Sequence, residues 1–186
     1  ICDSLCKIYS WDPNIEQIDK IKSFIKDKKE IVVKPLDGMG GKSIYKMDKI
    51  QESEIETLLK MTNNESTQII TQEFIEDIYE GDFRILIIHG KPFKKTLARI
   101  PQGDSFKGNL AAGGKGVVKD ISDFQFEMAS EIGDFLIQKD INFAGIDVIG
   151  NFLTEINVTS PTCARQILDQ SGDCLLYTSP SPRDRH

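Results

Sequence analysis

The stretch Val32–Met47, VVKPLDGMGGKSIYKM, limits the possible folds of this chain more than any other. It runs from an apolar segment through Lys34 into a glycine-rich turn. A Walker A loop requires a glycine at the position of Leu36, and a dinucleotide-binding fingerprint requires one at the position of Ser43. Both also require a helix directly afterwards, whereas the segment SIYKM is typical of a strand. The pattern therefore predicts a glycine-rich turn that joins two strands.

A turn of this kind can act as a flap, because its backbone N–H groups can fold over a triphosphate. Lys34, at the end of the preceding strand, would direct a positive charge towards the α- and β-phosphates. The alternative interpretation is an ordinary hairpin turn with solvated lysines. The turn alone does not decide between the two.

The composition excludes some classes of function. Of the 186 residues, 39% are hydrophobic and 28% are charged, as is usual for a globular protein. The formal net charge of −6 argues against a nucleic-acid-binding surface. No apolar run approaches the roughly 20 residues that span a bilayer. We therefore expect no nucleic-acid partner and no membrane partner, a cytoplasmic location, and cysteines that remain free thiols.

The remaining periodicity mixes helices with antiparallel hairpins. Helices are predicted for Asn14–Lys28, from a Ser53 cap to Lys60, and from a capping box formed by Ser122 and Gln125 to about Lys139. Strands are predicted for Glu30–Leu36, Ser43–Met47 and Ser66–Phe74, and hairpins for residues 83–100 and 141–158. A doubly wound parallel sheet would need regular alternation of strands and helices, so the pattern predicts an α+β fold.

The hairpin of residues 141–158 carries three oxygen donors, Asp147, Glu155 and Asn157. A strict two-residue turn would place Asp147 and Glu155 on opposite faces. A three-residue or bulged loop at Gly150–Phe152, with a glycine or asparagine at positive φ, pairs them instead, and we expect this arrangement. Two carboxylates and an amide oxygen are hard ligands suited to Mg²⁺.

The alternative for these three donors is a solvated strand edge. Their apolar neighbours look like core residues; they are Ile146, Val148, Ile149, Ile156 and Val158. The acids are therefore expected to be buried, where an uncompensated carboxylate is costly and a cation is its natural partner.

Five strings, KPLDGMGG, GDFRIL, LARIP, GNLAAGG and GIDVIGNFLTEINVTSPTC, together resemble the prokaryotic glutathione synthetase family of ATP-grasp ligases, from Ile31 to about Ile167. The resemblance implies two α+β subdomains with antiparallel sheets that hold ATP between them, a small one at about 30–75 and a larger metal-binding one at about 76–168. It implies ligation of γ-glutamylcysteine and glycine to glutathione through an acyl phosphate, with Mg²⁺ or Mn²⁺. It also implies a homo-oligomeric parent protein.

The resemblance also implies roles for individual residues. Nucleotide contacts are implied for Lys34, for the flap Gly38, Met39, Gly40 and Gly41, for the adenine hinge Glu73, Phe74 and Ile75, and for Asp82. Contacts with anions are implied for Arg84 and Arg99, and Asn109 is expected beside a lid at residues 101–116. The implied metal ligands are Asp147, Glu155 and Asn157. Contact with the peptide substrate is implied for Thr159 and Ser160.

The two ends of the chain depart from the family pattern. The chain opens on Ile1, so we expect a fragment without the N-terminal domain, in which residues 1–29 are a linker remnant and a helix. The tail Cys174–His186 resembles translated adapter read-through and is expected to be non-native. Two alternatives stay open: another ATP-grasp carboxylate–amine ligase, or a nucleotide-binding module without turnover.

Overall fold

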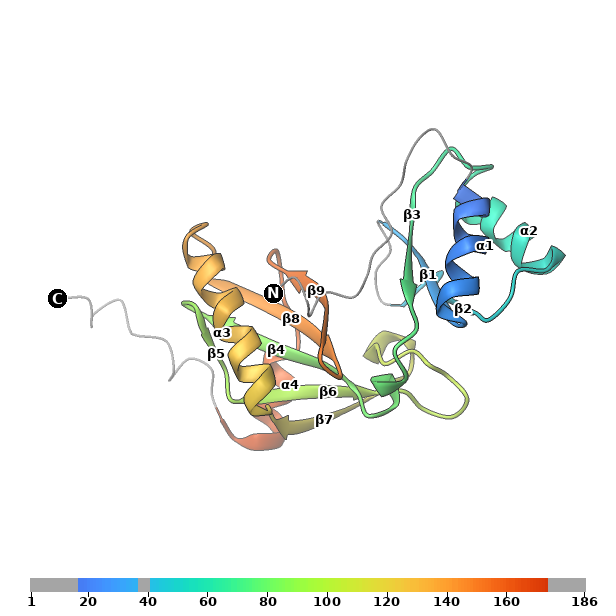
Figure 1. Cartoon of the computed structure of the whole chain (residues 1–186). Helices are drawn as coiled ribbons and strands as arrows, with labels where there is room; N and C mark the ends of the chain where they lie inside the picture. Colours follow the sequence, from blue (N-terminus) through green and yellow to red (C-terminus); the bar gives the residue numbers. More distant parts are fainter. Residues whose placement is uncertain (1–16, 37–40, 174–186) are drawn as a thin grey trace. The chain divides into compact units, whose positions relative to one another are not determined.

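The computed structural model describes residues 17–36 and 41–173, which form two compact units (Figure 1). The N-terminal unit extends to Glu76 and the C-terminal unit begins at Asp77. All described strand pairs are antiparallel, and helices accompany both sheets, which confirms the predicted α+β class. Within the described ranges, no helix combines the length and the apolar character needed to cross a membrane.

The N-terminal unit is a three-stranded sheet with two helices on one face. Its elements are α1 (Gln17–Lys28), β1 (Ile31–Pro35), β2 (Tyr45–Met47), α2 (Glu52–Met61) and β3 (Ile69–Glu73), with strand order β2-β1-β3. Ile31 and Val33 of β1 are fully buried against apolar side chains of α1 and α2, among them Phe24 and Leu58. Because side chains alternate along a strand, the residues between them lie on the opposite face of the sheet.

The start of α2 differs from the sequence prediction. Gln51 is the N-cap, and its backbone N–H donates to the Glu54 carboxylate at 3.0 Å. Ser53 lies inside the first turn and donates to the same carboxylate at 2.9 Å. The predicted Ser53 cap is therefore wrong, because a glutamine at the cap position can form the reciprocal pair with Glu54 that a serine usually forms.

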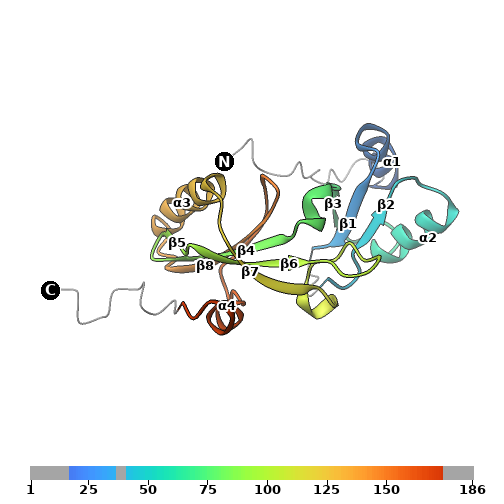
Figure 2. The same cartoon turned by 90° about the horizontal axis from the view of Figure 1, so that it is seen from below.

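The C-terminal unit is a six-stranded sheet with one helix on each face. Its strands are β4 (Asp82–Ile88), β5 (Lys91–Pro92), β6 (Lys95–Ile100), β7 (Lys115–Asp120), β8 (Phe143–Ile149) and β9 (Phe152–Asn157). The helices are α3 (Asp123–Ile137) and α4 (Ala164–Ser171), with short 3₁₀ helices η2 (Glu76–Tyr79) and η3 (Leu110–Ala112). The strand order is β7-β6-β4-β8-β9, with β5 paired to β4. Figure 2 shows α3 and α4 on opposite sides of the sheet.

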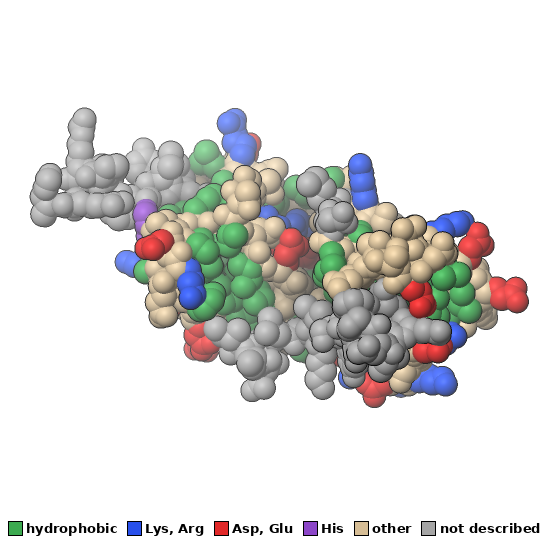
Figure 3. Space-filling view, turned by 90° about the horizontal axis from the view of Figure 1, so that it is seen from above, with side chains coloured by type: hydrophobic (Ala, Val, Ile, Leu, Met, Phe, Trp, Pro, Cys, Tyr) green, Lys and Arg blue, Asp and Glu red, His purple; other side chains and the backbone are tan. Residues whose placement is uncertain are grey.

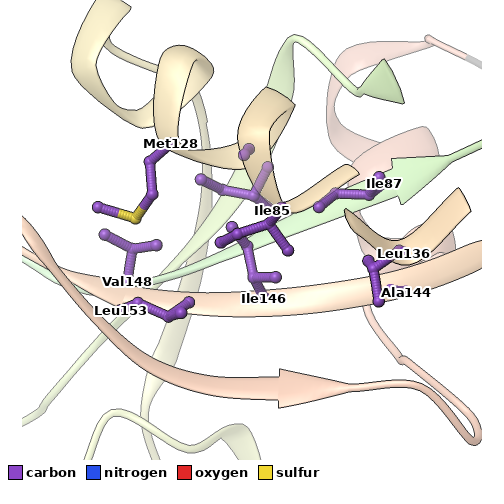
Figure 4. Packing of buried hydrophobic residues seen from close by; sticks show 10 residues of the cluster. Ile85, Ile87, Met128, Leu136, Ala144, Ile146, Val148 and Leu153 are labelled. Carbon is purple, nitrogen blue, oxygen red and sulfur yellow. The ribbon is translucent and has the colours of Figure 1, made fainter. Parts of the chain in front are cut away.

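Helix α3 covers the apolar face of this sheet. Ile85, Ile146 and Val148 from the sheet pack against Met128 and Leu136 of the helix (Figure 4). At the start of the helix, the Ser122 backbone N–H donates to the Gln125 side chain at 3.0 Å, and the Gln125 N–H donates to the Ser122 hydroxyl at 3.2 Å. The predicted capping box is confirmed.

The other face of the sheet is divided between apolar and polar side chains. Helix α4 covers an apolar part, where Leu86 and Leu97 pack with Cys163 and Ile167. Next to it, the same strands carry charged side chains on the face that α3 does not cover.

The β8–β9 hairpin pairs Asp147 with Glu155, as the sequence predicted. Ile149 pairs with Phe152, so the turn itself contains two residues, and Gly150 adopts φ +56°. The register shifts beyond Val148, which pairs with Leu153. Thr154 is therefore the extra residue, and the bulge lies within β9 instead of in the turn.

Part of the expected core of this hairpin is exposed. Ile156 and Val158 are 42% and 46% exposed, whereas Ile146 and Val148 are fully buried. Strand β9 is at the edge of the sheet, so another strand pairs with it on one side only. These two residues contribute to the exposed hydrophobic side chains of the molecule, and Figure 3 shows a group of such side chains on one face.

We predict that Gly133→Ala destabilises the protein, although alanine normally favours a helix over glycine by about 1 kcal/mol. A Cβ at this position of α3 would lie 2.0 Å from the Gly90 carbonyl oxygen, so helix and hairpin would have to separate. We expect a loss of roughly 2 kcal/mol in the free energy of unfolding, measured by urea denaturation with circular dichroism. Ser130→Ala, on the same helix, is the control and should change it by less than about 0.5 kcal/mol. Stabilisation by Gly133→Ala would contradict this packing.

Candidate functional site

The uncovered part of the six-stranded sheet gathers charged side chains from four strands. Directly opposed residues point to the same face, and the registers pair Asp82 with Arg99, Arg84 with Asp147, and Asp147 with Glu155. We call these five residues, together with Asn157, the polar face. Asn157 belongs to it because it lies two residues beyond Glu155 on β9.

Two arginines and two aspartates of the polar face form one ion-pair network. Arg84 donates from Nε to Asp147 Oδ1 and from Nη2 to Asp147 Oδ2, the latter at 2.8 Å. Arg99 Nη2 lies 2.8 Å from Asp147 Oδ2 and 2.5 Å from Asp82 Oδ2. All four side chains are between 4% and 13% exposed. The network is therefore buried and, with two charges of each sign, formally neutral.

These pairs correct one step of the sequence argument. Burial of Asp147 was expected to call for a metal cation, but Arg84 and Arg99 already neutralise this carboxylate. The burial alone is thus explained without a metal. Metal ligation by this hairpin stays a prediction that depends on the type and position of its oxygen donors.

Burial changes the ionisation of the network. Burial and the nearby charge of Asp147 raise the pKa of Asp82 to about 6, although Arg99 opposes the shift. Its Oδ1 atom has no hydrogen-bond partner among the described residues. Burial disfavours the charged form of Arg84 and Arg99, but their aspartate partners outweigh it and raise the pKa of both guanidiniums. Both arginines therefore stay charged, and Asp82 carries an unused oxygen.

The three predicted metal ligands lie together on the polar face. Glu155 is exposed and pairs with Asp147 across the hairpin. In the amide orientation that satisfies both neighbours, Asn157 donates to Glu155 Oε1 at 2.9 Å and accepts from Arg84 Nη2 at 3.2 Å. Across residues 17–36 and 41–173, no group of three or more His, Cys, Asp or Glu side chains is placed to hold a metal. The hairpin thus offers two carboxylates and one amide.

The glycine-rich loop before β7 packs closely onto the polar face. A Cβ at Gly108 would lie 2.5 Å from the Arg99 carbonyl oxygen and 3.3 Å from Asp82 Cβ. The Asn109 carbonyl oxygen accepts the N–H groups of Ala112 and Gly114, which closes the loop. The structure therefore places the predicted lid residue Asn109 directly after a contact with Asp82 and Arg99.

Two predicted substrate residues, Thr159 and Ser160, follow β9 and are exposed. They lie two and three residues beyond Asn157, in the segment that leads to α4.

In the N-terminal unit, the predicted phosphate-binding residue Lys34 lies on the sheet face opposite the helices. Lys34 pairs with Ile70, and Val32 pairs with Gln72 and with Lys46, so these side chains share that face. Lys34 is half-buried. Of the predicted flap, Gly41 is buried with φ +78°, and Gly38, Met39 and Gly40 lie outside the described residues.

The predicted hinge begins at Glu73, the last residue of β3. Lys46 lies 3.0 Å from Glu30 and stacks at 3.7 Å over the Phe74 ring, which holds this ring at the end of the strand. Glu73 pairs with Lys28 at 3.7 Å. Ile75 is half-buried.

Sequence reasoning missed Gln72, which precedes this hinge. Its side chain is 6% exposed, and its Nε2 donor has no partner among the described residues. A buried donor without a partner is costly unless a ligand accepts its hydrogen bond. The available signal was the alternation along the strand. Gln72 is two residues from Ile70 and two from Phe74, and its side chain lies on the same sheet face as that of Lys34.

Comparisons with known proteins identify similar sequences. Residues 13–172 match the family model described as prokaryotic glutathione synthetase, ATP-grasp domain. The chain is 43% identical to the glutathione synthetase of Xylella fastidiosa (strain 9a5c) over 152 residues, which are 82% of this chain and 48% of the relative. It is 44% identical to that of Pseudomonas aeruginosa over 155 residues, 83% of this chain and 49% of the relative. The chain thus spans about half the length of the curated relatives it matches.

Solved structures show the same fold at low identity. D-cycloserine synthetase DcsG superposes with a TM-score of 0.64 at 13% identity, covering 85% of this chain and 58% of that one. D-alanyl-alanine synthetase A from Vibrio cholerae superposes with a TM-score of 0.62 at 14% identity, covering 92% of this chain and 57% of that one. The ATP-grasp ligase PsnB superposes with a TM-score of 0.62 at 14% identity, covering 92% of this chain and 50% of that one. These likenesses confirm the predicted ATP-grasp fold.

We predict that Arg84→Leu lowers the free energy of unfolding by about 3–5 kcal/mol, because it leaves Asp147 buried with a single cationic partner. The matched control is Arg165→Leu, which breaks the exposed Arg165–Asp169 pair of α4. It should cost less than about 1 kcal/mol. Urea denaturation followed by circular dichroism measures both variants, and equal losses would contradict the difference in burial.

Proposed function

The chain belongs to the prokaryotic glutathione synthetase ATP-grasp family, and from this premise we propose that it supplies the ATP-binding part of an enzyme that joins γ-glutamylcysteine to glycine. The reaction would convert ATP to ADP and phosphate. One observation carries the proposal: two buried arginines and three oxygen donors share one sheet face, within the region that matches the family.

The polar face suits phosphoryl transfer to a carboxylate. A carboxylate is a poor electrophile, so the cysteinyl carboxylate is first phosphorylated by ATP. The amine of glycine then attacks the acyl phosphate and expels phosphate. Such chemistry needs positioning and charge neutralisation and no protein nucleophile. Accordingly, His89 lies in a turn beside Asn142, and Cys163 is buried among apolar side chains, so neither is assigned a catalytic role.

We assign the nucleotide to the helix-free sheet face of the N-terminal unit. Lys34 would contact the phosphates under the flap of Gly38, Met39, Gly40 and Gly41. The hinge residues Glu73, Phe74 and Ile75 would contact adenine, chiefly through backbone groups. The Gln72 amide adds a donor that matches the acceptor nitrogens of a purine base. This assignment gives a role to the Gln72 Nε2 donor, which the described part of the chain leaves without a partner.

Membership of the family implies ATP and a divalent metal, and we propose Mg²⁺ or Mn²⁺ in particular. The donor set fits a hard cation, because Asp147, Glu155 and Asn157 all offer oxygen. When bound, the metal would supply charge neutralisation for the transferring phosphoryl group.

Arg84 and Arg99 would contact anions with the Nη1 groups that their aspartate bonds leave unused. Asp82, whose Oδ1 has no partner within the described residues, would lie near the nucleotide. Residues 101–116, including Asn109, would close as a lid and protect the acyl phosphate from water. Thr159 and Ser160 would line the side of the peptide substrate. We also propose a cytoplasmic location and a homo-oligomeric full-length protein.

Isothermal titration of the chain with Mg-ATP, followed by a coupled ADP assay with γ-glutamylcysteine and glycine, tests the proposal. We expect binding by the chain, and turnover by a protein that contains the remaining half of the relatives' length. Turnover with another acceptor instead of glycine would support a different carboxylate–amine ligase. Absence of turnover in the longer protein would support a binding module.

We predict that Glu155→Gln in the longer protein lowers turnover by at least about 100-fold, because one charged metal ligand is lost. The control is Glu56→Gln on the exposed face of α2, where the carboxylate pairs only with Lys60 among the bonds described. This control should retain the parent rate. A near-normal rate for Glu155→Gln would remove the metal assignment.

We predict that Gln72→Leu separates stability from binding. The substitution removes a buried amide donor that has no partner in residues 17–36 and 41–173, so the ligand-free chain should unfold at the same or a higher urea concentration. Mg-ATP should bind about tenfold more weakly, because a hydrogen bond to the base is lost. Gln68→Leu, at an exposed position before β3, is the control and should not weaken binding. Unchanged affinity in Gln72→Leu would contradict the base contact.

A further inference from the structure

The two arginines of the polar face affect how a metal ion can bind there. We propose that Arg84 and Arg99 close this face to bare divalent cations, so that the protein takes up its metal together with a polyphosphate and not before it. The inference rests on the proposed function, because it assumes that the β8–β9 hairpin holds the cation.

The first argument is the occupation of the oxygen atoms. Asp147 Oδ2 already faces Arg84 Nη2 and Arg99 Nη2, both at 2.8 Å, and Oδ1 accepts from Arg84 Nε. Each carboxylate oxygen can accept two hydrogen bonds, so one position on Oδ1 remains unused. The Asn157 oxygen also accepts from Arg84 Nη2 at 3.2 Å. Two of the three candidate ligands are therefore shared with guanidinium groups.

The second argument is the charge balance. The buried network contains Arg84, Arg99, Asp82 and Asp147 and is formally neutral. Glu155 adds one negative charge, but it is exposed to solvent. A bare divalent cation would thus meet two fixed positive charges without an excess of buried negative charge. Repulsion between charges is strong where water is excluded, so the ion should stay in solution.

A polyphosphate reverses this balance. Its three or four negative charges attract both guanidiniums and the cation at once. The Nη1 groups of Arg84 and Arg99, which are not used in the aspartate bonds, can meet the anion without breaking the network. Anion and metal should therefore each increase the affinity for the other, and by linkage this coupling is reciprocal.

Asp82 has a specific part in this arrangement. Its Oδ2 atom holds Arg99 at 2.5 Å, while Oδ1 has no partner among the described residues. Asp82 therefore supplies the second negative charge that keeps the ligand-free network neutral. Removal of Arg99 alone should leave one excess negative charge beside Asp147, and removal of Arg99 together with the Asp82 charge should restore neutrality.

The test is titration of the full 186-residue chain with Mn²⁺ by equilibrium dialysis, in which the excess of total Mn²⁺ on the protein side reports the protein-bound ion even when ATP, which itself binds Mn²⁺, is present on both sides. For the wild-type chain we expect a Kd for Mn²⁺ alone above about 10 mM, and binding at least about 100-fold tighter when ATP is present. Arg99→Met should bind Mn²⁺ alone at least about tenfold more tightly than the wild-type chain. Asp82→Asn/Arg99→Met should return to the wild-type value.

Arg165→Met is the matched control, because this arginine belongs to an exposed pair with Asp169 on α4, and none of its bonds among the described residues reaches the polar face. It should leave Mn²⁺ binding unchanged. Arg99→Met is the variant at risk of misfolding, which circular dichroism would reveal. If Arg99→Met does not fold, Asn157→Asp tests the inference in its place, because it adds a negative charge at a half-buried position and removes no ion-pair partner. It should also bind Mn²⁺ alone at least about tenfold more tightly.

Three results would overturn the inference. The wild-type chain could bind bare Mn²⁺ as tightly as it binds Mn²⁺ with ATP, or the affinity for bare Mn²⁺ could fail to increase in folded Arg99→Met or in Asn157→Asp. The double variant could also bind bare Mn²⁺ as tightly as Arg99→Met does. The last result would show that the free oxygen, and not the charge, controls binding. Failure of the proposed function looks different, because the wild-type chain would then bind neither bare Mn²⁺ nor Mn²⁺ with ATP. That result would also overturn the inference, because it assumes that the hairpin holds the cation.

Discussion

The pairing of buried charges on one face of the six-stranded sheet constrains the rest of the C-terminal unit. Arg84 and Arg99 can be buried only because Asp82 and Asp147 neutralise them at hydrogen-bonding distance. Close approach of the backbone supports this arrangement. A Cβ at Gly145 would lie 2.8 Å from Pro161 Cβ and 3.0 Å from Arg84 Cδ, so glycine leaves room for the arginine stem. The network therefore depends on small residues beside it as well as on its own charges.

Each unit uses its sheet in the same way. One face is covered by helices and packs apolar side chains, as around Ile31 and Val33 in one unit and Ile85 and Ile146 in the other. The other face, which α4 covers only in part in the C-terminal unit, keeps the polar side chains that a ligand can meet, including the Gln72 Nε2 and Asp82 Oδ1 atoms, which have no partner among the described residues. Strand alternation thus assigns structural and ligand-binding roles to neighbouring residues of the same strand.

The sequence was informative where the pattern is local. The α+β class, the Ser122–Gln125 box and the pairing of Asp147 with Glu155 follow from spacing within a few residues, and the structure confirms them. The same reasoning placed the extra hairpin residue in the turn, because it could not show that Thr154 bulges within the strand. The cap at Gln51 was missed since glutamine is not a usual capping residue.

Contacts between segments that are distant in the chain could not be predicted from the sequence. Arg84 and Asp147 are separated by 63 positions, and their register follows from the pairing of β4 with β8. Without that register, a buried Asp147 suggested a metal, whereas its partners are guanidiniums. Exposure of Ile156 depends on which elements cover the edge of the sheet, and this information is not contained in the alternation of the strand. The roles assigned through the family resemblance to individual site residues remain proposals.

The central claim is that Arg84 and Asp147 form a buried, mutually dependent ion pair. A double-mutant cycle with Arg84→Leu, Asp147→Leu and the double variant measures it directly, with the free energy of unfolding as the readout. The account predicts a coupling energy of at least about 2 kcal/mol, since each single variant leaves an uncompensated buried charge that the double variant removes. Additive losses, with a coupling energy below about 0.5 kcal/mol, would contradict it.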